Sequence, residues 1–294
     1  MKMFTFLFCG KIFLGGDILI TSENIKNRIT MISEMKNEST FQVLEYDSLQ
    51  GASDLNAALQ IKLMKDSGIR LKQIRIILDD SAVKIESGAL SYMKGNIDIV
   101  TKMGGIVGLG KKLFSSKVTG ESMFKPILRG TGEVFLESSF GYFTLIELED
   151  EEIIIDDKLF CACEEGIDVN PIMQKNISSV LFGNEGVYQS KLSGSGIVVL
   201  EIPVPEKEIL RCKLFRDTLK VDGNFAILRS ANIEFTVEKS GTTLIGTTIN
   251  GEGLLNVYNG TGEVWLAPTI SVYDNLREGG LKDLKDFDED TLDE

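Results

Sequence analysis

A glycine-rich segment and an acidic segment are the parts of this chain whose residue types could do chemistry. Residues 105–111 fit the spacing G-x-x-x-x-G-K, which in nucleotide-binding proteins cradles phosphates. The next residue should then be Ser or Thr to hold magnesium, and Lys112 stands there instead. Gly120 follows too soon for a long helix. We therefore predict no nucleotide site.

Seven carboxylates crowd residues 147–157. Paired carboxylates can act as acid and base or can bind calcium. No Asp-x-Asp-x-Asp-Gly loop is present, so we predict a solvent-exposed turn between two modules. The seven are Glu147, Glu149, Asp150, Glu151, Glu152, Asp156 and Asp157.

The chain contains no histidine, which removes the commonest general base and transition-metal ligand. Ser-His-Asp and Cys-His triads are thereby excluded within one chain. Cys161 and Cys163 would share one face of a strand, but a lone C-x-C lacks the second ligand pair that zinc needs. We predict two small buried side chains there. No enzyme activity, cofactor or metal is expected.

The net charge of −13 favours solubility and repels nucleic-acid phosphates, so we do not expect a nucleic-acid partner. Two apolar runs, 3–9 and 12–20, lie near the N-terminus. Neither reaches the ~18–20 residues of a membrane span, and no signal cleavage site follows the first. We expect a cytoplasmic protein. Residues 1–35 fit either an extra β-hairpin-like segment or an upstream choice of start site.

One short pattern occurs three times: GTGEVFL, GSGIVVL and GTGEVWL. Their first glycines are 194 − 130 = 64 and 260 − 194 = 66 residues apart. A fixed period of this size indicates a repeated supersecondary unit. We predict three β modules at about 68–140, 145–205 and 210–270.

Each pattern is expected at a tight hairpin, where glycine supplies a positive φ. The strands that follow are apolar at successive positions, so both of their faces should be buried. They would then lie centrally or at a subunit contact. The expected turn glycines are Gly130, Gly132, Gly194, Gly196, Gly260 and Gly262.

The fold class is therefore all-β, with three sandwich or barrel modules in one compact body. Apolar residues at helical spacing predict a short helix from Ser53 to Lys65, capped by Ser53 and ended by Gly68. The domains are an N-terminal extension (1–50), a β body (51–275) and an acidic tail (276–294).

The first module is longer than the others. Matching Asp80 with Asp157 and with Gly223 gives it about 13 extra residues, which fall around 104–117. Insertions in repeat proteins often map to the functional face. Apolar residues beside a basic pair suit contact with a membrane surface or a partner. The alternative is a loop folded onto its own core or an oligomer axis. The candidate contact residues are Ile106, Val107, Leu109, Lys111, Lys112, Leu113 and Phe114.

Several motifs resemble the bacterial branch of the altered-inheritance-of-mitochondria family over about 70–275. They are residues 78–97, 181–189 and 221–229, together with GTGEVFL. The resemblance implies TRAP-like modules, similar to the tryptophan RNA-binding attenuation protein, in a homotrimer. A mitochondrial relative is linked to inner-membrane organisation, which favours a membrane-proximal insertion. The chain has no clustered basic stripe, so RNA and tryptophan binding are not carried over.

We thus expect a non-enzymatic, cytoplasmic homo-oligomer that acts as a scaffold or interaction module, near a membrane or a protein partner. The alternative is a small-molecule-binding regulator with ligands between the modules. Stabilisation by a ligand in a thermal-shift screen would distinguish the two.

Deleting residues within 104–117 should leave the β body folded, because the other two modules manage without this segment. If the insertion contacts membranes, binding to anionic vesicles should fall with salt, and fall again in Lys111→Glu plus Lys112→Glu. Each basic residue near such a surface contributes about 1 kcal/mol. Vesicle flotation measures the binding, and no flotation at low salt contradicts the membrane version.

Overall fold

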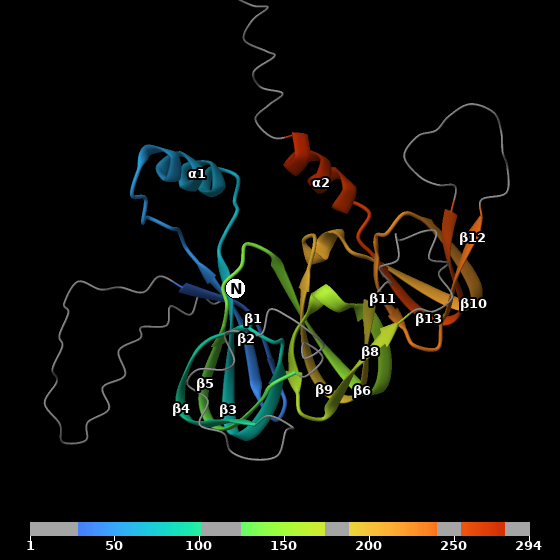
Figure 1. Ribbon diagram of the computed structural model, residues 1–294, viewed down its shortest axis with the longest axis horizontal. Coiled ribbons are helices and arrows are strands. Elements are labelled where there is room, and N and C mark those ends of the chain that lie inside the picture. The colour runs from blue at the N-terminus through green and yellow to red at the C-terminus, as the bar shows by residue number, and fades with distance from the viewer. Residues whose placement is uncertain (1–28, 101–124, 174–187, 240–253, 280–294) are drawn as a thin grey trace, which may run out of the picture. The chain divides into compact units, whose positions relative to one another are not determined.

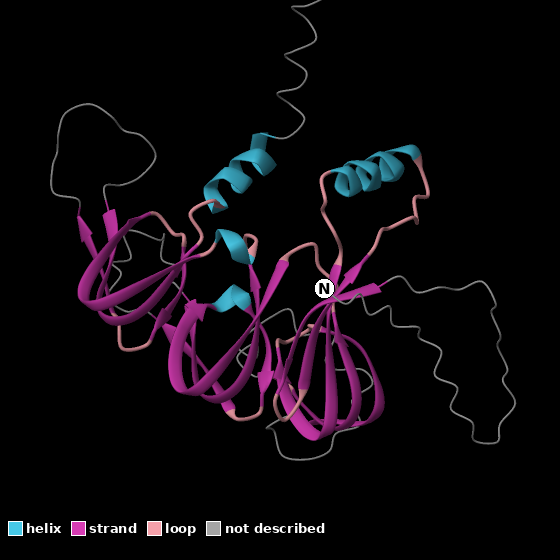
Figure 2. Cartoon of the chain, turned by 180° about the vertical axis from the view of Figure 1, so that it is seen from behind, coloured by secondary structure: helices cyan, strands magenta, loops and turns pink. Residues whose placement is uncertain are grey.

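Antiparallel strands dominate the structure, a computed structural model that describes residues 29–100, 125–173, 188–239 and 254–279 (Figures 1 and 2). Each strand pair with a defined register is antiparallel. The described chain contains two α-helices beside the strands. The predicted all-β class is confirmed.

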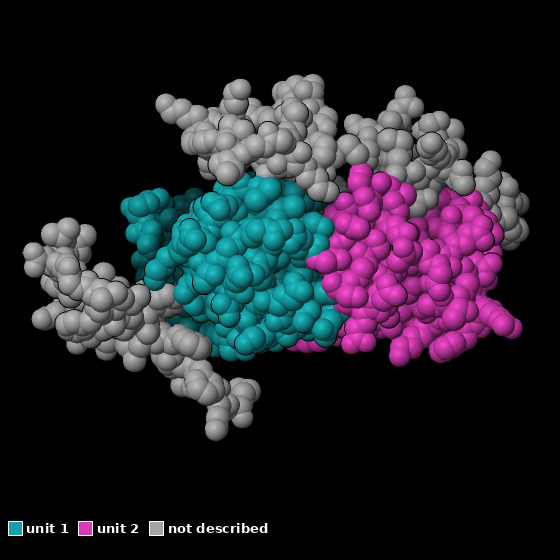
Figure 3. Space-filling view, turned by 90° about the horizontal axis from the view of Figure 1, so that it is seen from below, with its two compact units in different colours: residues 1–147, 161–165, 196–199 teal, residues 148–160, 166–195, 200–294 magenta. Residues whose placement is uncertain are grey.

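The chain divides into two compact units, coloured separately in Figure 3. Unit 1 comprises residues 1–147, 161–165 and 196–199, and unit 2 comprises 148–160, 166–195 and 200–294. Strands β6 (Tyr142–Asp156) and β9 (Tyr188–Ile202) therefore contribute residues to both units.

Unit 1 is built around β3, which pairs with β2, β5 and β7, while β4 pairs with β5. A short connection joins β1 to β2, which form an antiparallel hairpin. The elements are β1 (Ile29–Lys36), β2 (Thr40–Tyr46), α1 (Leu55–Asp66), β3 (Lys72–Ile85), β4 (Leu90–Val100), β5 (Ile127–Leu136) and β7 (Phe160–Glu164).

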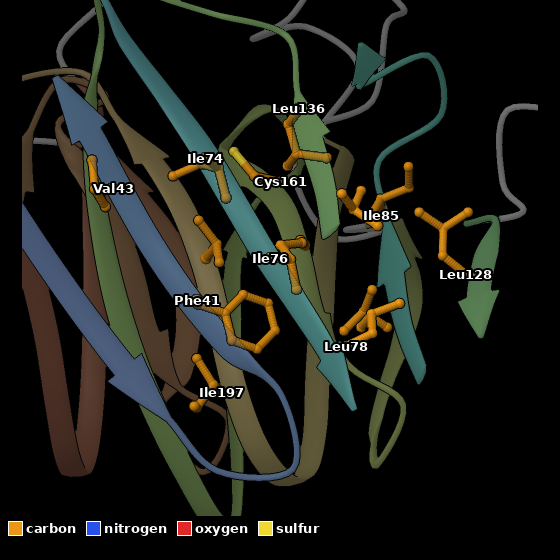
Figure 4. Packing of buried hydrophobic residues seen from close by; sticks show 14 residues of the cluster. Phe41, Val43, Ile74, Ile76, Leu78, Ile85, Leu128, Leu136, Cys161 and Ile197 are labelled. Carbon is orange, nitrogen blue, oxygen red and sulfur yellow. The ribbon is translucent and has the colours of Figure 1, made fainter. Parts of the chain in front are cut away.

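Alternation along β3 builds the core of unit 1. Ile74, Ile76 and Leu78 project to one side, as alternate residues of a strand must, and each is at most 1% exposed (Figure 4). Phe41 and Val43 of β2 pack against the same cluster. The packed β structure therefore begins before residue 51, where the sequence analysis had started the β body.

Unit 2 is built around β13, which pairs with β10, β11 and β12. Strand β11 also pairs with β6, and β8 with β9. The remaining elements are η2 (Asp157–Leu159), β8 (Ile167–Met173), η3 (Glu206–Glu208), β10 (Leu210–Asp222), β11 (Ala226–Ser230), β12 (Glu234–Lys239), β13 (Leu254–Leu266) and α2 (Ile270–Gly279).

The two helices differ in how well the sequence predicted them. Helix α1 lies where the spacing of apolar residues placed it, but Asp54 caps it, since its carboxylate accepts from the Ala57 N–H at 2.9 Å. Ser53 is not the cap. Gly68 does follow the helix end, with a φ of 73°. Helix α2 was not predicted.

The three GxG motifs lie inside the continuous strands β5, β9 and β13, so the predicted hairpins are wrong. The prediction of positive φ is confirmed, because all six glycines have φ between 120° and 156°. At the first motif, close approach of the neighbouring backbone also leaves no room for a side chain. A Cβ on Gly130 would lie 2.1 Å from the carbonyl oxygen of Asn96, and one on Gly132 would lie 2.2 Å from that of Lys94.

The middle residue of each motif accepts a hydrogen bond from the backbone of the paired region. Each donor is a non-glycine residue with φ between 52° and 55°. Such residues are uncommon outside turns, so the same local bend occurs three times. The bonds run from Asp80 to Thr131 (3.0 Å), from Asp150 to Ser195 (2.9 Å) and from Arg216 to Thr261 (3.0 Å).

This geometry corrects the matching of positions made from the sequence. Asp80 corresponds to Asp150 and Arg216, and not to Asp157 and Gly223. Counted from the bend to the second glycine of each motif, the first interval exceeds the others by 52 − 46 = 6 residues, and not by about 13.

Replacing Gly130 by alanine should destabilise unit 1 by at least about 2 kcal/mol, because the new Cβ meets backbone and the left-handed φ is strained. Gly51→Ala is the matched control, since a Cβ there has nothing within 4 Å. Urea denaturation followed by circular dichroism measures both. Equal midpoints for the two variants would refute the close-approach explanation.

Candidate interaction surface

The insertion singled out from the sequence, 104–117, lies outside the described residues, and so do all seven of its candidate contact residues. The six motif glycines lie within strands and serve the backbone crossing. Among the sites predicted from sequence, the described part of the chain therefore offers structural positions only. Candidate surfaces have to be sought in the exposed side chains.

The acidic segment is exposed, as predicted, but it does not form a turn between modules. It lies on strand β6 and continues into η2. Glu152 pairs with Lys191 at 2.8 Å within unit 2. Among the described residues no group of three or more Cys, Asp or Glu side chains could hold a metal ion. The strip behaves as a solvated strand surface.

Cys161 and Cys163 are buried, as predicted. Both lie on β7 and are free thiols. Their exposed fractions are 9% and 0%. The two therefore act as small core side chains of unit 1.

A buried carboxylate on the same strand escaped the sequence analysis. Glu164 is 1% exposed and accepts three hydrogen bonds. The donors are the side-chain amide of Asn37 (3.0 Å), the backbone N–H of Ser39 (2.9 Å) and the backbone N–H of Ile197 (3.0 Å). This carboxylate anchors the β1–β2 connection to β9. The one signal available was a charged residue ending the apolar run FCACE.

Helix α1 carries leucines on a face that none of the described residues of unit 1 covers. Leu55, Leu59 and Leu63 recur every four residues and are 86%, 53% and 50% exposed. Ile61 and Met64 lie on another face and are partly buried. Both faces of the helix are thus apolar, and only one is used within the unit.

A small pocket lies between α1 and the strand ends of unit 1. Ile61, Met64 and Lys65 line it from the helix. The other lining residues come from the connections around the helix and strands, namely Tyr46, Ser48, Leu49, Ile69, Arg70, Leu71 and Phe140.

Strand β4 exposes an aromatic and an aliphatic side chain at two consecutive positions. Tyr92 and Met93 are 51% and 38% exposed. The ring of Tyr92 stacks on Phe135 with centroids 4.4 Å apart. Next to this stack, Arg75 of β3 and Glu133 of β5 form an ion pair at 2.9 Å. Exposed apolar groups beside a fixed polar network are typical of interaction surfaces.

The comparisons with known proteins identify the family. The family model described as "Mitochondrial biogenesis AIM24" matches residues 65–269, more than half of the chain. The chain belongs to the AIM24 family. This confirms the resemblance seen in the sequence motifs. The AIM24 match begins at the last turn of α1 and ends just before α2.

An X-ray crystal structure of a protein from Streptococcus pyogenes is similar to this AIM24 protein at 20% identity, with a TM-score of 0.49. The alignment covers 72% of this chain and 95% of that one. No curated protein matches the chain. Among the described residues no helix is long and apolar enough to cross a membrane.

Replacing Glu164 by glutamine should destabilise the protein by about 1 to 3 kcal/mol, because an N–H₂ would replace one of the two oxygens that accept the three hydrogen bonds and would face at least one N–H donor. The neighbouring Glu165→Gln is the matched control. Its side chain is partly exposed and pairs with Arg129, so its loss should cost less than about 1 kcal/mol. Midpoints of urea denaturation measure both, and a neutral Glu164→Gln would show that the anchor contributes nothing.

Proposed function

We propose that this AIM24 protein is a non-enzymatic scaffold that assembles with copies of itself and presents interaction surfaces. The observation that carries the proposal is the exposure of large apolar side chains on α1, β4, β10 and α2. Besides those already described, they are Leu210 (54%), Phe215 (78%), Val272 (55%) and Leu276 (68%). Such exposure is costly for a monomer unless a partner covers it.

A second part of the proposal is that the chain consists of three related β modules. The three bends at Asp80, Asp150 and Arg216 support it, since each donates to the middle residue of a GxG motif. The first and third bends share further contacts. Arg75 lies over the Phe135 ring, and Arg211 over the Trp265 ring, with distances of 5.9 and 4.2 Å. In both cases the arginine precedes its bend by five residues.

Related modules favour self-assembly. The surface with which one module contacts the next is also present on the last module, where no further module of the same chain covers it. A homotrimer in the cytoplasm is the form that we propose. A net charge of −13 opposes association between copies, so the contacts have to be apolar or made by the backbone.

The pocket beside α1 supports the alternative function, a small-molecule-binding regulator. Its lining mixes apolar side chains with Lys65 and Arg70, which would suit an acidic ligand. Thermal shifts with amino acids, nucleotides and lipids test this alternative, and the Lys65→Ala variant should lose any shift that arises at the pocket.

Light scattering of the full chain at micromolar concentration should report a mass above that of one chain, because the exposed apolar side chains favour association. A monomer that persists over the micromolar range would contradict the scaffold proposal.

A further inference from the structure

Two short strand pairings join successive modules within the chain. In unit 1, the second half of β3 pairs with β7. In unit 2, the second half of β6 pairs with β11. The partners are Val83↔Glu164, Lys84↔Cys163 and Ile85↔Ala162 in the first case, and Ile153↔Ser230, Ile154↔Arg229 and Ile155↔Leu228 in the second.

The two pairings are the same pairing at two places. Each starts three residues after a positive-φ bend, at Asp80 or at Asp150. Each is also flanked by the same backbone hydrogen bond, from Glu165 to Ala82 (3.1 Å) and from Ala231 to Glu152 (2.9 Å). The two pairings therefore agree in their register, in their three-residue distance from the bend and in the backbone hydrogen bond beside them.

The third bend lacks such a partner in the described chain. Counting three residues on from Arg216 gives Leu219, Lys220 and Val221 of β10. Among the described strands β10 pairs only with β13, so this segment has an unpaired edge. The Lys220 side chain is half exposed, at 49%, and forms an ion pair with Glu238 of β12 at 2.6 Å.

The strand segment that would pair with β10 in the same way also has an unpaired edge among the described strands, and it lies on β4 of the first module. Strand β4 carries a register shift between Leu90 and Tyr92, and β11 carries one between Ala226 and Leu228, each against the end of its GxG strand. Residues 92–94 of β4 thus occupy the position of residues 228–230 of β11. Of the described strands, only β5 pairs with β4.

Exposure distinguishes the unpaired positions of β4 from the paired ones, whereas Val221 of β10 is already buried in the core of its own unit. In the two internal pairings, Val83, Cys163 and Ile155 are 0% exposed. At the unpaired positions Tyr92 is 51% and Met93 38% exposed. Two of the three side chains at this unpaired edge, Tyr92 and Met93, are apolar and exposed, and an unpaired edge with exposed apolar side chains favours pairing with another chain.

We propose that β10 of one copy pairs with β4 of a second copy, antiparallel, and repeats between copies the pairing that joins modules within the chain. The register follows from the internal pairings: Leu219 faces Lys94, Lys220 faces Met93, and Val221 faces Tyr92 of the second copy. This inference rests on the proposed self-assembly and on the three-module organisation.

The contact is head to tail, because the two strands come from opposite ends of the described modules. A head-to-tail contact leaves one free β4 and one free β10 on any open assembly, so copies add until a ring closes. Backbone hydrogen bonds supply most of the attraction, which is why the contact tolerates a chain with a net charge of −13.

Cysteine cross-linking of the full chain tests the register directly. Met93→Cys with Lys220→Cys, in a background with Cys9 and Cys212 replaced by serine, should form disulfide-linked multimers on mild oxidation. Directly opposed residues of antiparallel strands have Cα atoms about 4.5–5.5 Å apart, within the range of a disulfide. Met93→Cys with Lys213→Cys is the control, since Lys213 lies on the same strand but roughly 23 Å from Lys220.

A charge exchange supplies a second test that does not depend on oxidation. Met93→Lys places a positive charge opposite Lys220 and should weaken assembly at least about tenfold in sedimentation velocity. Adding Lys220→Glu, together with Glu238→Gln to remove the carboxylate that pairs with Lys220 within its own chain, should restore assembly, which a merely unfolded variant cannot do. Circular dichroism confirms that each variant is folded.

The inference would be supported if Met93→Cys cross-links with Lys220→Cys but not with Lys213→Cys, and if the charge exchange restores assembly. Assembly without cross-linking at Met93 and Lys220 would overturn it and leave the scaffold proposal standing. A wild-type chain that stays monomeric in the same sedimentation runs would overturn both.

Discussion

The constraint on which the structure depends is the close crossing of two backbones at the first GxG motif, with a similar close approach at Gly194 of the second. A carbonyl oxygen lies so near Gly130 and Gly132 that no side chain fits, and the strand must pass through a positive φ there. The hydroxyl between the glycines, at Thr131, then satisfies a backbone N–H on the bent strand opposite. Strand β3 pairs with β5 on both sides of the bend, whereas its pairing with β2 ends before the bend and its pairing with β7 begins after it. One local crossing thus decides which strands become neighbours.

The alternation of side chains along strands and the special role of the glycines could be predicted from the sequence, but the pairing of the strands could not. The apolar residues after each GxG motif predicted strands, and the glycines predicted a positive φ. The same glycines suggested hairpins, because a tight turn and a close crossing demand the same backbone conformation. Nothing local distinguishes the two, since the crossing depends on Asn96, far away along the chain.

The buried polar anchor and the exposed surfaces show the same limit. Glu164 looked like a residue ending an apolar strand, and its three donors come from positions up to 127 residues away. Leu59 and Leu63 fitted an ordinary amphipathic helix, whereas the structure leaves them in solvent. Burial is a property of the assembled fold, so a pattern shows which face is apolar but not what covers it. A chain of related modules adds one clue, because strand edges that are paired between its inner modules are left unpaired on its first and last modules.

Hydrogen exchange at increasing protein concentration tests the central claim most directly, namely that the two unpaired edges are filled by a second copy. The account predicts that the amides of 92–94 and 219–221 become protected together as the concentration rises, whereas those of 162–164 and 228–230 are protected throughout. Fast exchange at 92–94 and 219–221 in samples that are already oligomeric would contradict it.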